Sequence, residues 1–421
     1  MTKDPTLKFP KDFLWGAATS SHQVEGGQNN NWTRWEMKQA SRLARGSAKA
    51  FDTPAVHWYR IKDKALDPNN YISGRAVDHF NRYEEDFSIA KSLHHNAHRF
   101  SLEWSRIEPE RGEFDTQAIK HYREVIQALR KRGIEPLVTL WHFTLPHWVQ
   151  EQGGFTNPRT AMDFARYADR MAREFGSEVT YWCTMNEPEL LASFSYWLGY
   201  WPPQKKSFFA GLSAYTSILP QAHIMAYRKI KRRNPDAQVG ISKNMMWYYA
   251  DGRIISPLAA KLWNWFGNFY FLDLTRGHQD YIGINYYIKY QFRGWKWHIS
   301  EQNPSDMGWG LHPEGLKVLI GKTARRFPKK PIIITEVGLA DSQDESRAWY
   351  IKELLRNIHQ AIADGANVQG FMYWALLDNF EWDKGFWPEF GLVSVDRKTM
   401  RRTVRPSAFV YADIIKRGGL D

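Results

Sequence analysis

Two glutamates stand at the ends of apolar runs, where a carboxylate is costly unless it is paired or used in chemistry. Glu187 follows Tyr-Trp-Cys-Thr-Met-Asn and precedes Pro188, and Glu336 follows Pro-Ile-Ile-Ile-Thr. A pair of carboxyl groups can act as general acid and as nucleophile or base in one reaction. The alternative is a structural ion pair, and these residue types alone leave both interpretations open.

Short β-rich apolar runs alternate with amphipathic helical stretches along the chain. The expected strands are residues 13–19, 97–104, 135–142, 179–186, 238–244, 281–287, 331–336 and 368–376. The clearest helical stretches between them are residues 80–93, 118–130, 159–175 and 345–363. This alternation favours a parallel sheet. Eight units predict the α/β class and a single (β/α)8 TIM barrel that spans residues 1–421.

Several expected strands begin apolar and end in polar or aromatic residues, as in Arg-Phe-Ser-Leu-Glu-Trp and Thr-Met-Asn-Glu-Pro. The carboxyl ends of the strands of a parallel barrel open on one face, which carries the active site of barrel enzymes. We therefore expect residues scattered between positions 23 and 382 to converge on one pocket.

The composition limits where the protein can act. The single cysteine, Cys183, excludes an intramolecular disulfide and a cysteine metal cluster, and it fits a cytoplasmic location. No apolar run approaches the ~20 residues that a membrane helix needs. The first eight residues have no apolar segment typical of a secretory signal.

The net charge of +12 raises the alternative of a nucleic-acid-binding protein. Lysines and arginines are spread along the chain, with short clusters at residues 130–132, 231–233 and 401–402. We expect a solvated basic surface and no nucleic-acid partner. The 20 tryptophans suit stacking on sugar rings, but they also fill protein cores, so they favour neither role alone.

A series of motifs runs in order along the chain. They are Phe13-Leu14-Trp15-Gly16-Ala17-Ala18-Thr19-Ser20, Gln23-Val24-Glu25-Gly26, Arg99-Phe100-Ser101-Leu102-Glu103-Trp104-Ser105-Arg106, Trp141-His142-Phe143-Thr144-Leu145-Pro146, Thr184-Met185-Asn186-Glu187-Pro188, Gly283-Ile284-Asn285-Tyr286-Tyr287, Ile334-Thr335-Glu336-Val337-Gly338 and Asp378-Asn379-Phe380-Glu381-Trp382. Together they resemble glycoside hydrolase family 1, the β-glucosidase family, over nearly the whole chain.

The resemblance implies a retaining β-glycosidase that removes the terminal non-reducing β-D-glycosyl residue of small glycosides or oligosaccharides. Glu336 matches the nucleophile of the family and Glu187 its acid/base. Retaining enzymes hold these two groups about 5–5.5 Å apart. β-Glucoside is the expected substrate, with β-galactoside and β-fucoside as further ones.

The resemblance also assigns supporting and substrate-binding residues. Arg99 and Tyr287 match residues that stabilise the ionised nucleophile, and Asn186 matches the residue that binds the sugar 2-hydroxyl. The residues that match glycone contacts are Gln23, His142, Glu381 and Trp382, with Trp374 as the platform under the ring. Trp309 is a candidate for the aglycone side, with packing as the alternative.

Neither a metal nor a cofactor is expected. His142 has no second ligand at a recognisable spacing. A carboxylate at Glu381 would repel a phosphate, which favours unphosphorylated glycosides over the 6-phospho-β-glycosides that some relatives use.

The chain departs from the family pattern at several places. Val337 replaces the usual asparagine after the nucleophile, and residues 245–279 and 202–211 form shorter segments than is common. These segments normally help to wall the entrance. The aromatic residues between 263 and 271 could shape it, pack helices or form an oligomer contact.

Two further functions are considered, a transglycosidase and a sugar-binding pseudoenzyme. The same carboxylates serve a transglycosidase, in which a sugar or alcohol replaces water. A sugar-binding pseudoenzyme would lack one glutamate, whereas both are present. The sequence also allows a homo-oligomer.

Overall fold

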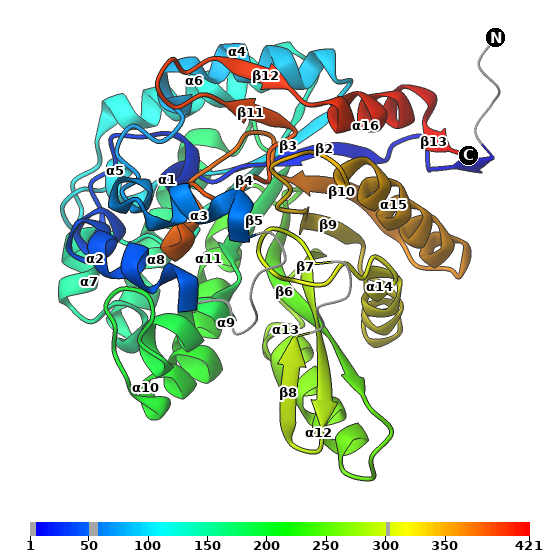
Figure 1. Ribbon diagram of the computed structural model, residues 1–421. Coiled ribbons are helices and arrows are strands. Elements are labelled where there is room, and N and C mark those ends of the chain that lie inside the picture. Colours follow the sequence, from blue (N-terminus) through cyan, green and yellow to red (C-terminus); the bar gives the residue numbers. More distant parts are fainter. Residues whose placement is uncertain (1–5, 50–57, 300–303) are drawn as a thin grey trace.

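The computed structural model describes residues 6–49, 58–299 and 304–421. Most of the N-terminal segment on which the expectation of no secretory signal rests lies outside these residues. Within them, eight parallel strands form a closed barrel (Figure 1). They are β2 (Leu14–Ala18), β3 (Ala97–Ser101), β4 (Glu135–Thr139), β5 (Tyr181–Asn186), β6 (Gln238–Ala250), β7 (Tyr281–Arg293), β9 (Ile332–Val337) and β10 (Val368–Trp374).

The expected (β/α)8 barrel is confirmed. Neighbouring strands pair in parallel in the order β6-β5-β4-β3-β2-β10-β9-β7, and pairing of β6 with β7 closes the ring. Each expected strand is present, with ends that differ by one to several residues. Within the barrel the strands are almost fully buried because helices cover their outer faces.

Helices surround the barrel and follow the strands in sequence. The longer ones are α2 (Asn31–Gly46), α4 (His79–Ser92), α6 (Thr116–Lys131), α8 (Arg159–Phe175), α11 (Leu219–Arg233), α14 (Glu314–Arg326), α15 (Arg347–Ala363) and α16 (Pro406–Arg417). The shorter ones are α1 (Ser21–Val24), α3 (Trp58–Leu66), α5 (Trp104–Ile107), α7 (His147–Glu151), α9 (Pro188–Leu190), α10 (Phe208–Ser213), α12 (Ser256–Trp263) and α13 (Tyr270–Leu274). Three π-helical segments also occur: η4 (Leu191–Trp197), η5 (Ala214–Ile218) and η6 (Asn264–Phe269).

Local sequence explains where several helices begin and end. Asp115 caps α6 by accepting the backbone N–H groups of Gln117 and Ala118. Asn30 and Thr33 form a reciprocal capping box at the start of α2. The basic residues at the end of α11 lie where the helix dipole favours cations.

The segments expected to be short loops contain regular structure. Strands β6 and β7 continue past the barrel, and β8 (Lys296–Ile299) pairs with β7 as an antiparallel hairpin. Figure 1 shows this ribbon and α12 projecting at the bottom of the view. Residues 245–279 therefore form a strand extension and helices, and α10 takes up the end of the 202–211 segment.

Two small antiparallel sheets complete the fold. Strand β1 (Leu7–Lys8) pairs with β13 (Gly419–Leu420), so the two ends of the described chain lie side by side (Figure 1). Strand β11 (Val393–Val395) pairs with β12 (Arg402–Val404).

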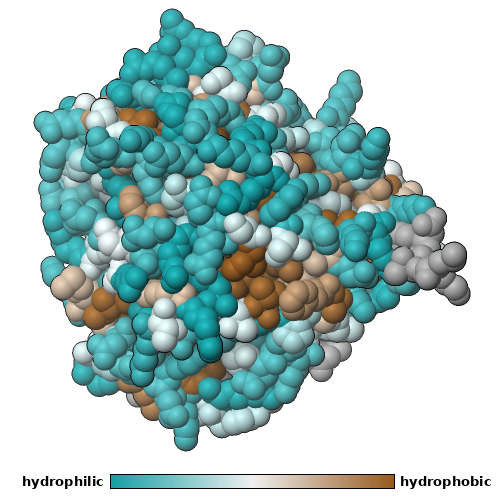
Figure 2. Space-filling view, turned by 90° about the horizontal axis from the view of Figure 1, so that it is seen from above, coloured by the Kyte–Doolittle hydropathy of each residue, from teal (hydrophilic) through white to brown (hydrophobic). Residues whose placement is uncertain are grey.

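The basic clusters are largely engaged in ion pairs. These pairs are Arg130–Glu135, Arg132–Glu84, Lys231–Asp280, Arg233–Asp169 and Arg402–Asp86. Figure 2 shows that the face seen from above, over α4, α6 and α16, is mostly hydrophilic. Among the residues that the structure describes, no helix is both long and apolar enough to span a bilayer.

Gly16 tests how closely the barrel strands pack. A Cβ at this position would lie 1.9 Å from the Ala97 carbonyl oxygen and 3.1 Å from Met372 Sδ. We predict that Gly16→Ala lowers the free energy of unfolding by about 1–3 kcal/mol or more, because β2 must move away from β3. Chemical denaturation measures this loss.

Gly46→Ala is the matched control, because a Cβ there would meet nothing within 4 Å. Wild-type stability for Gly16→Ala would contradict the prediction.

Candidate active site

One cavity of about 320 Å³ opens at the carboxyl ends of the barrel strands. The sequence-predicted residues that line it are Gln23, His142, Asn186, Glu187, Tyr287, Trp309, Glu336, Trp374, Glu381 and Trp382. Arg99 does not line the cavity but contacts Glu336 and Asn186 from below. The structure thus brings together residues that lie far apart along the chain.

Glu336 lies on β9 and is held by two donors. The Arg99 guanidinium, buried on β3, forms an ion pair with Oε1 of Glu336. The Tyr287 hydroxyl, on β7, donates to Oε2 over 3.1 Å. Both contacts favour the ionised carboxylate, as expected for a nucleophile.

Glu187 follows β5 directly and has a left-handed backbone, with φ 44°. Its backbone N–H donates to the Ser242 carbonyl oxygen on β6 over 2.8 Å. Its Oε1 accepts a hydrogen bond of 2.8 Å from Asn285 Nδ2. A left-handed conformation is unusual for a residue other than glycine and is often found at functional sites.

The surroundings of the two carboxyl groups give them different pKa values. Burial raises the pKa of Glu187 well above its usual range, and the charges of Glu336 and Glu189 raise it further. Burial also raises the pKa of Glu336, but Arg99 and the hydrogen bonds from Tyr287 and Asn285 lower it. Glu187 is therefore the group that keeps its proton, and Glu336 is the group that ionises first.

Asn285 is a site residue to which the sequence assigned no role. Its Nδ2 donates to Glu187 Oε1 and, over 3.1 Å, to Asn186 Oδ1, and its Oδ1 accepts from Thr335 Oγ1 over 2.7 Å. It lies two residues before Tyr287 on β7, so both side chains face the same side of the strand. This spacing from Tyr287 is the sequence feature that could have indicated a role for Asn285 in the site.

The polar end of the pocket contains Glu381. Its Oε2 accepts hydrogen bonds from Gln23 Nε2 at 3.2 Å and Asn379 Nδ2 at 3.0 Å. Burial raises the pKa of Glu381 to about 8. Glu381 lines the pocket. Asn379 is buried beside it, and the sequence did not predict this contact.

Three rings lie in parallel beside this polar end. His142 stacks between Trp374 and Trp382, with ring centroids 6.0 Å from each. Burial and the Arg99 charge lower the pKa of His142 well below its usual range, so the ring is neutral. Asn186 Nδ2 donates to His142 Nε2 over 3.2 Å, and Nδ1 is buried with no hydrogen-bond partner among the residues that the structure describes.

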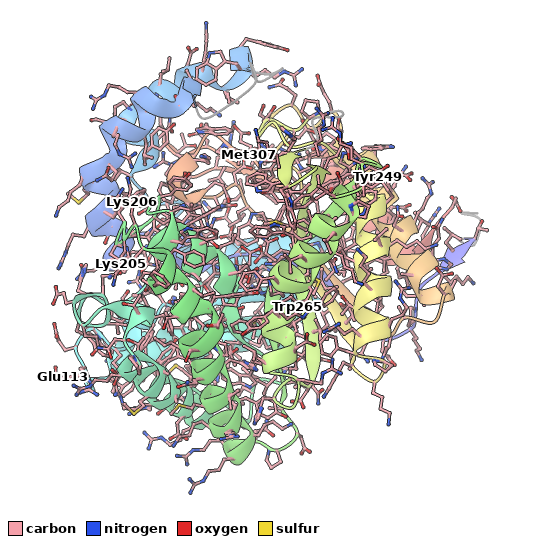
Figure 3. All side chains as sticks on the ribbon, turned by 90° about the horizontal axis from the view of Figure 1, so that it is seen from below. Glu113, Lys205, Lys206, Tyr249, Trp265 and Met307 are labelled. Carbon is pink, nitrogen blue, oxygen red and sulfur yellow. The ribbon has the colours of Figure 1, made fainter. Side chains whose placement is uncertain are left out.

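The outer part of the pocket is apolar, which the sequence did not reveal. The additional apolar and aromatic lining residues are Phe143, Leu190, Phe194, Tyr200, Trp201, Met246, Ile288, Tyr290, Ile299, Met307 and Phe390, and the polar Asn244, Asp383 and Lys384 also line the pocket. Trp309 lines the pocket and also packs against Tyr287, with ring centroids 6.0 Å apart. Figure 3 shows Met307, on the loop before α14, well apart from Lys205 and Lys206 before α10.

Val337 lies in the hydrophobic core and does not line the pocket. This departure from the family pattern therefore changes packing behind Glu336. Among the described residues, no cluster of three or more histidine, cysteine or acidic side chains could hold a metal ion.

Comparison with known proteins identifies the family. The profile of glycosyl hydrolase family 1 matches residues 6–303 and 273–420. The chain belongs to glycosyl hydrolase family 1. It is 30% identical to beta-glucosidase A of Acetivibrio thermocellus, over 98% of this chain and 99% of the relative.

Solved structures of the family have the same fold. The β-glycosidase from Pyrococcus horikoshii superimposes with a TM-score of 0.85 at 34% identity, over 99% of this chain and 96% of that one. The β-glucosidase from Thermotoga maritima in complex with castanospermine superimposes with a TM-score of 0.86 at 27% identity. The match covers 99% of this chain and 100% of that one.

Tyr287→Phe tests whether the hydroxyl of Tyr287 stabilises the ionised form of Glu336. The substitution removes a hydrogen bond to the ionised carboxylate, so the pKa of Glu336 should rise. A group that must be ionised limits activity as the pH falls, so the acidic limb of kcat/KM should move up by roughly 0.5–1 pH unit. A pH profile of aryl glycoside hydrolysis measures the shift.

Tyr286→Phe is the control, because this neighbour points to the other face of β7 and donates to the His312 carbonyl oxygen. Equal profiles for the two variants would contradict the role of Tyr287.

Proposed function

We propose that this protein is a retaining β-glycosidase that removes the terminal non-reducing β-D-glycosyl residue, with β-glucoside as its first substrate. The observation that carries the proposal is the unequal environment of two carboxyl groups in one pocket. Arg99 and Tyr287 contact Glu336, whereas Glu187 is buried beside like charges and hydrogen-bonded by a neutral amide.

In the first step, ionised Glu336 attacks the anomeric carbon, and the bond from that carbon to the glycosidic oxygen breaks. Protonated Glu187 donates its proton to that oxygen, so the alcohol leaves neutral. A covalent glycosyl-enzyme results. Asn186 supports this step, because Arg99 and Asn285 fix its amide beside the nucleophile. We assign it to the sugar 2-hydroxyl.

In the second step, Glu187 is a carboxylate and accepts a proton from water as the water oxygen attacks the anomeric carbon. Glu336 leaves as a carboxylate, and the sugar keeps its original configuration. An alcohol or sugar in place of water gives transglycosylation. Product analysis with added acceptors separates the two outcomes.

The glycone is held at the polar end of the pocket. We propose that Gln23, His142, Glu381 and Trp382 bind its hydroxyl groups and that the Trp374 ring supports its apolar face. Trp309 is assigned to the aglycone. Gln23, His142 and Glu381 line the pocket, and their amide, imidazole and carboxyl groups suit hydroxyl groups, which both donate and accept hydrogen bonds.

We further propose that residues 1–421 form one glycosidase domain that works in the cytoplasm without a metal or cofactor. The pairing of β1 with β13 supports the domain assignment, since it joins both ends of the chain to one fold. The single cysteine fits a reducing compartment. A small β-glycoside is the proposed partner.

We predict that Glu336→Gln and Glu187→Gln each reduce hydrolysis of a phenyl β-glucoside by at least about 10²–10⁴-fold, the range typical of a lost acid or base. Glu336→Gln should form no glycosyl-enzyme. On a 2,4-dinitrophenyl β-glucoside, whose phenolate leaves without a proton, Glu187→Gly with azide should regain activity and give a β-glycosyl azide, because a small anion replaces the water that needs a base.

Asp86→Asn serves as the control, because this buried carboxylate pairs with Arg402 on the outside of the barrel. Near-wild-type rates for either Gln variant would rule out the assignment.

A panel of aryl β-glycosides tests the glycone. Phosphate at the sugar 6-position would meet the Glu381 carboxyl, and among the described residues that line the pocket Lys384 is the one lysine or arginine. Phosphate carries charge that this site does not balance. We predict that kcat/KM for the 6-phospho-β-glucoside is at least roughly 100-fold below that for the β-glucoside.

The β-galactoside and β-fucoside belong in the same panel, since the proposal includes both as further substrates. Preference for the phosphorylated sugar would support a 6-phospho-β-glycosidase instead.

A further inference from the structure

A second buried ion pair lies directly behind Glu187. Lys243, on β6, is fully buried, and its Nζ lies 2.9 Å from Oε1 of Glu189. Glu189 is two residues after Glu187, on α9. Nζ also donates to the carbonyl oxygens of Gly267 at 2.6 Å and Asn244 at 2.9 Å. The ammonium thus donates two hydrogen bonds to backbone carbonyls and forms an ion pair with Glu189.

We propose that the Lys243–Glu189 pair is a positioning element for the proton donor, which fixes the turn that carries Glu187 and balances the charge behind it. The inference rests on the proposed function and deepens it. It adds two residues, from β6 and α9, that touch neither substrate nor reacting atoms.

The first part of the argument is geometric. Glu187 has a left-handed backbone, and its N–H is bonded to the carbonyl oxygen of Ser242, the residue before Lys243. On the other side of the turn, Glu189 is bound to Lys243 itself. Two consecutive residues of β6 thus hold both sides of the turn. Strained backbone persists only where surrounding contacts hold it in this way.

The pair also connects the turn to η6. The Gly267 carbonyl oxygen belongs to this π-helical segment, whose Trp265 is labelled in Figure 3. A π-helical turn presents backbone carbonyls that an α-helix would bond internally, and such turns are frequent at functional sites. Here one of them accepts from a buried ammonium.

The second part of the argument is electrostatic. The charged or titratable groups that face Glu187 are Glu336, Arg99, Glu189, Lys243 and Tyr287. Arg99 balances Glu336, and Lys243 balances Glu189. With both pairs intact, a protonated Glu187 leaves the buried cluster with no net charge. Ionising Glu187 places an unbalanced charge in a buried site, which is costly.

Removing the charge of Glu189 should therefore weaken the proton affinity of Glu187. Lys243 would be left without its counter-ion, and a nearby cation favours a carboxylate. A group that must be protonated limits kcat/KM as the pH rises. Glu189→Gln should consequently move the alkaline limb of kcat/KM for phenyl β-glucoside to lower pH by roughly one unit.

The leaving group provides a second readout. A 2,4-dinitrophenolate leaves without a proton, whereas a phenolate needs one. Above its shifted limb, Glu189→Gln should lose roughly 10-fold in kcat/KM on the phenyl β-glucoside and less than about 2-fold on the dinitrophenyl β-glucoside. A residue that only stabilises the fold would lower both rates alike.

The double variant Glu189→Gln with Lys243→Met removes both charges. It should return the alkaline limb to within a few tenths of a pH unit of wild type, because the charge behind Glu187 is again zero. It also keeps the test possible if the single variant does not fold. Asp86→Asn is the matched control, since it breaks a buried ion pair outside the barrel.

An unchanged alkaline limb in Glu189→Gln, or an equal shift in Asp86→Asn, would overturn the inference. So would a double variant whose limb stays displaced. Failure of the proposed function looks different, because the wild-type protein would then hydrolyse neither glycoside.

Discussion

Parallel pairing of β6 with β7 closes the barrel, and the active site depends on that closure. A closed parallel barrel directs every strand's carboxyl end to one face and leaves no free edge. Arg99 on β3, Tyr287 on β7 and Glu336 on β9 meet only because these strands share one ring. The short strands are rigid because helices bury their outer sides, so the side chains at their ends are held in fixed positions.

Within that frame, charge balance governs the chemistry. Three carboxyl groups share the region with two buried cations: Glu187 and Glu336 are buried and Glu189 is partly buried, and the cations are Arg99 and Lys243. Each cation contacts a different carboxylate, so Glu187 is the one without a cation of its own. Burial then keeps Glu187 protonated, whereas Arg99 keeps Glu336 ionised. The division of roles thus follows from which strand carries each cation.

The pocket itself is divided into a polar inner end and an apolar outer end. At the inner end, amides, Glu381 and the neutral ring of His142 suit the hydroxyl groups of a sugar. The ring of His142 stacks against those of Trp374 and Trp382. At the outer end, residues from the extended β6 and β7 strands and from η4 contribute aliphatic and aromatic side chains.

The sequence by itself determined the fold class and most residues of the site. Each barrel strand has its own apolar run, and each motif consists of residues close together in the sequence. The strands and the motifs can therefore be recognised from the sequence alone. Tertiary structure alone decided how these residues interact. The helices in residues 245–279, the role of Asn285 and the pairing of Lys243 with Glu189 depend on contacts between separate elements. A pKa likewise depends on distances to charges from other strands, which closure of the barrel sets and linear order does not.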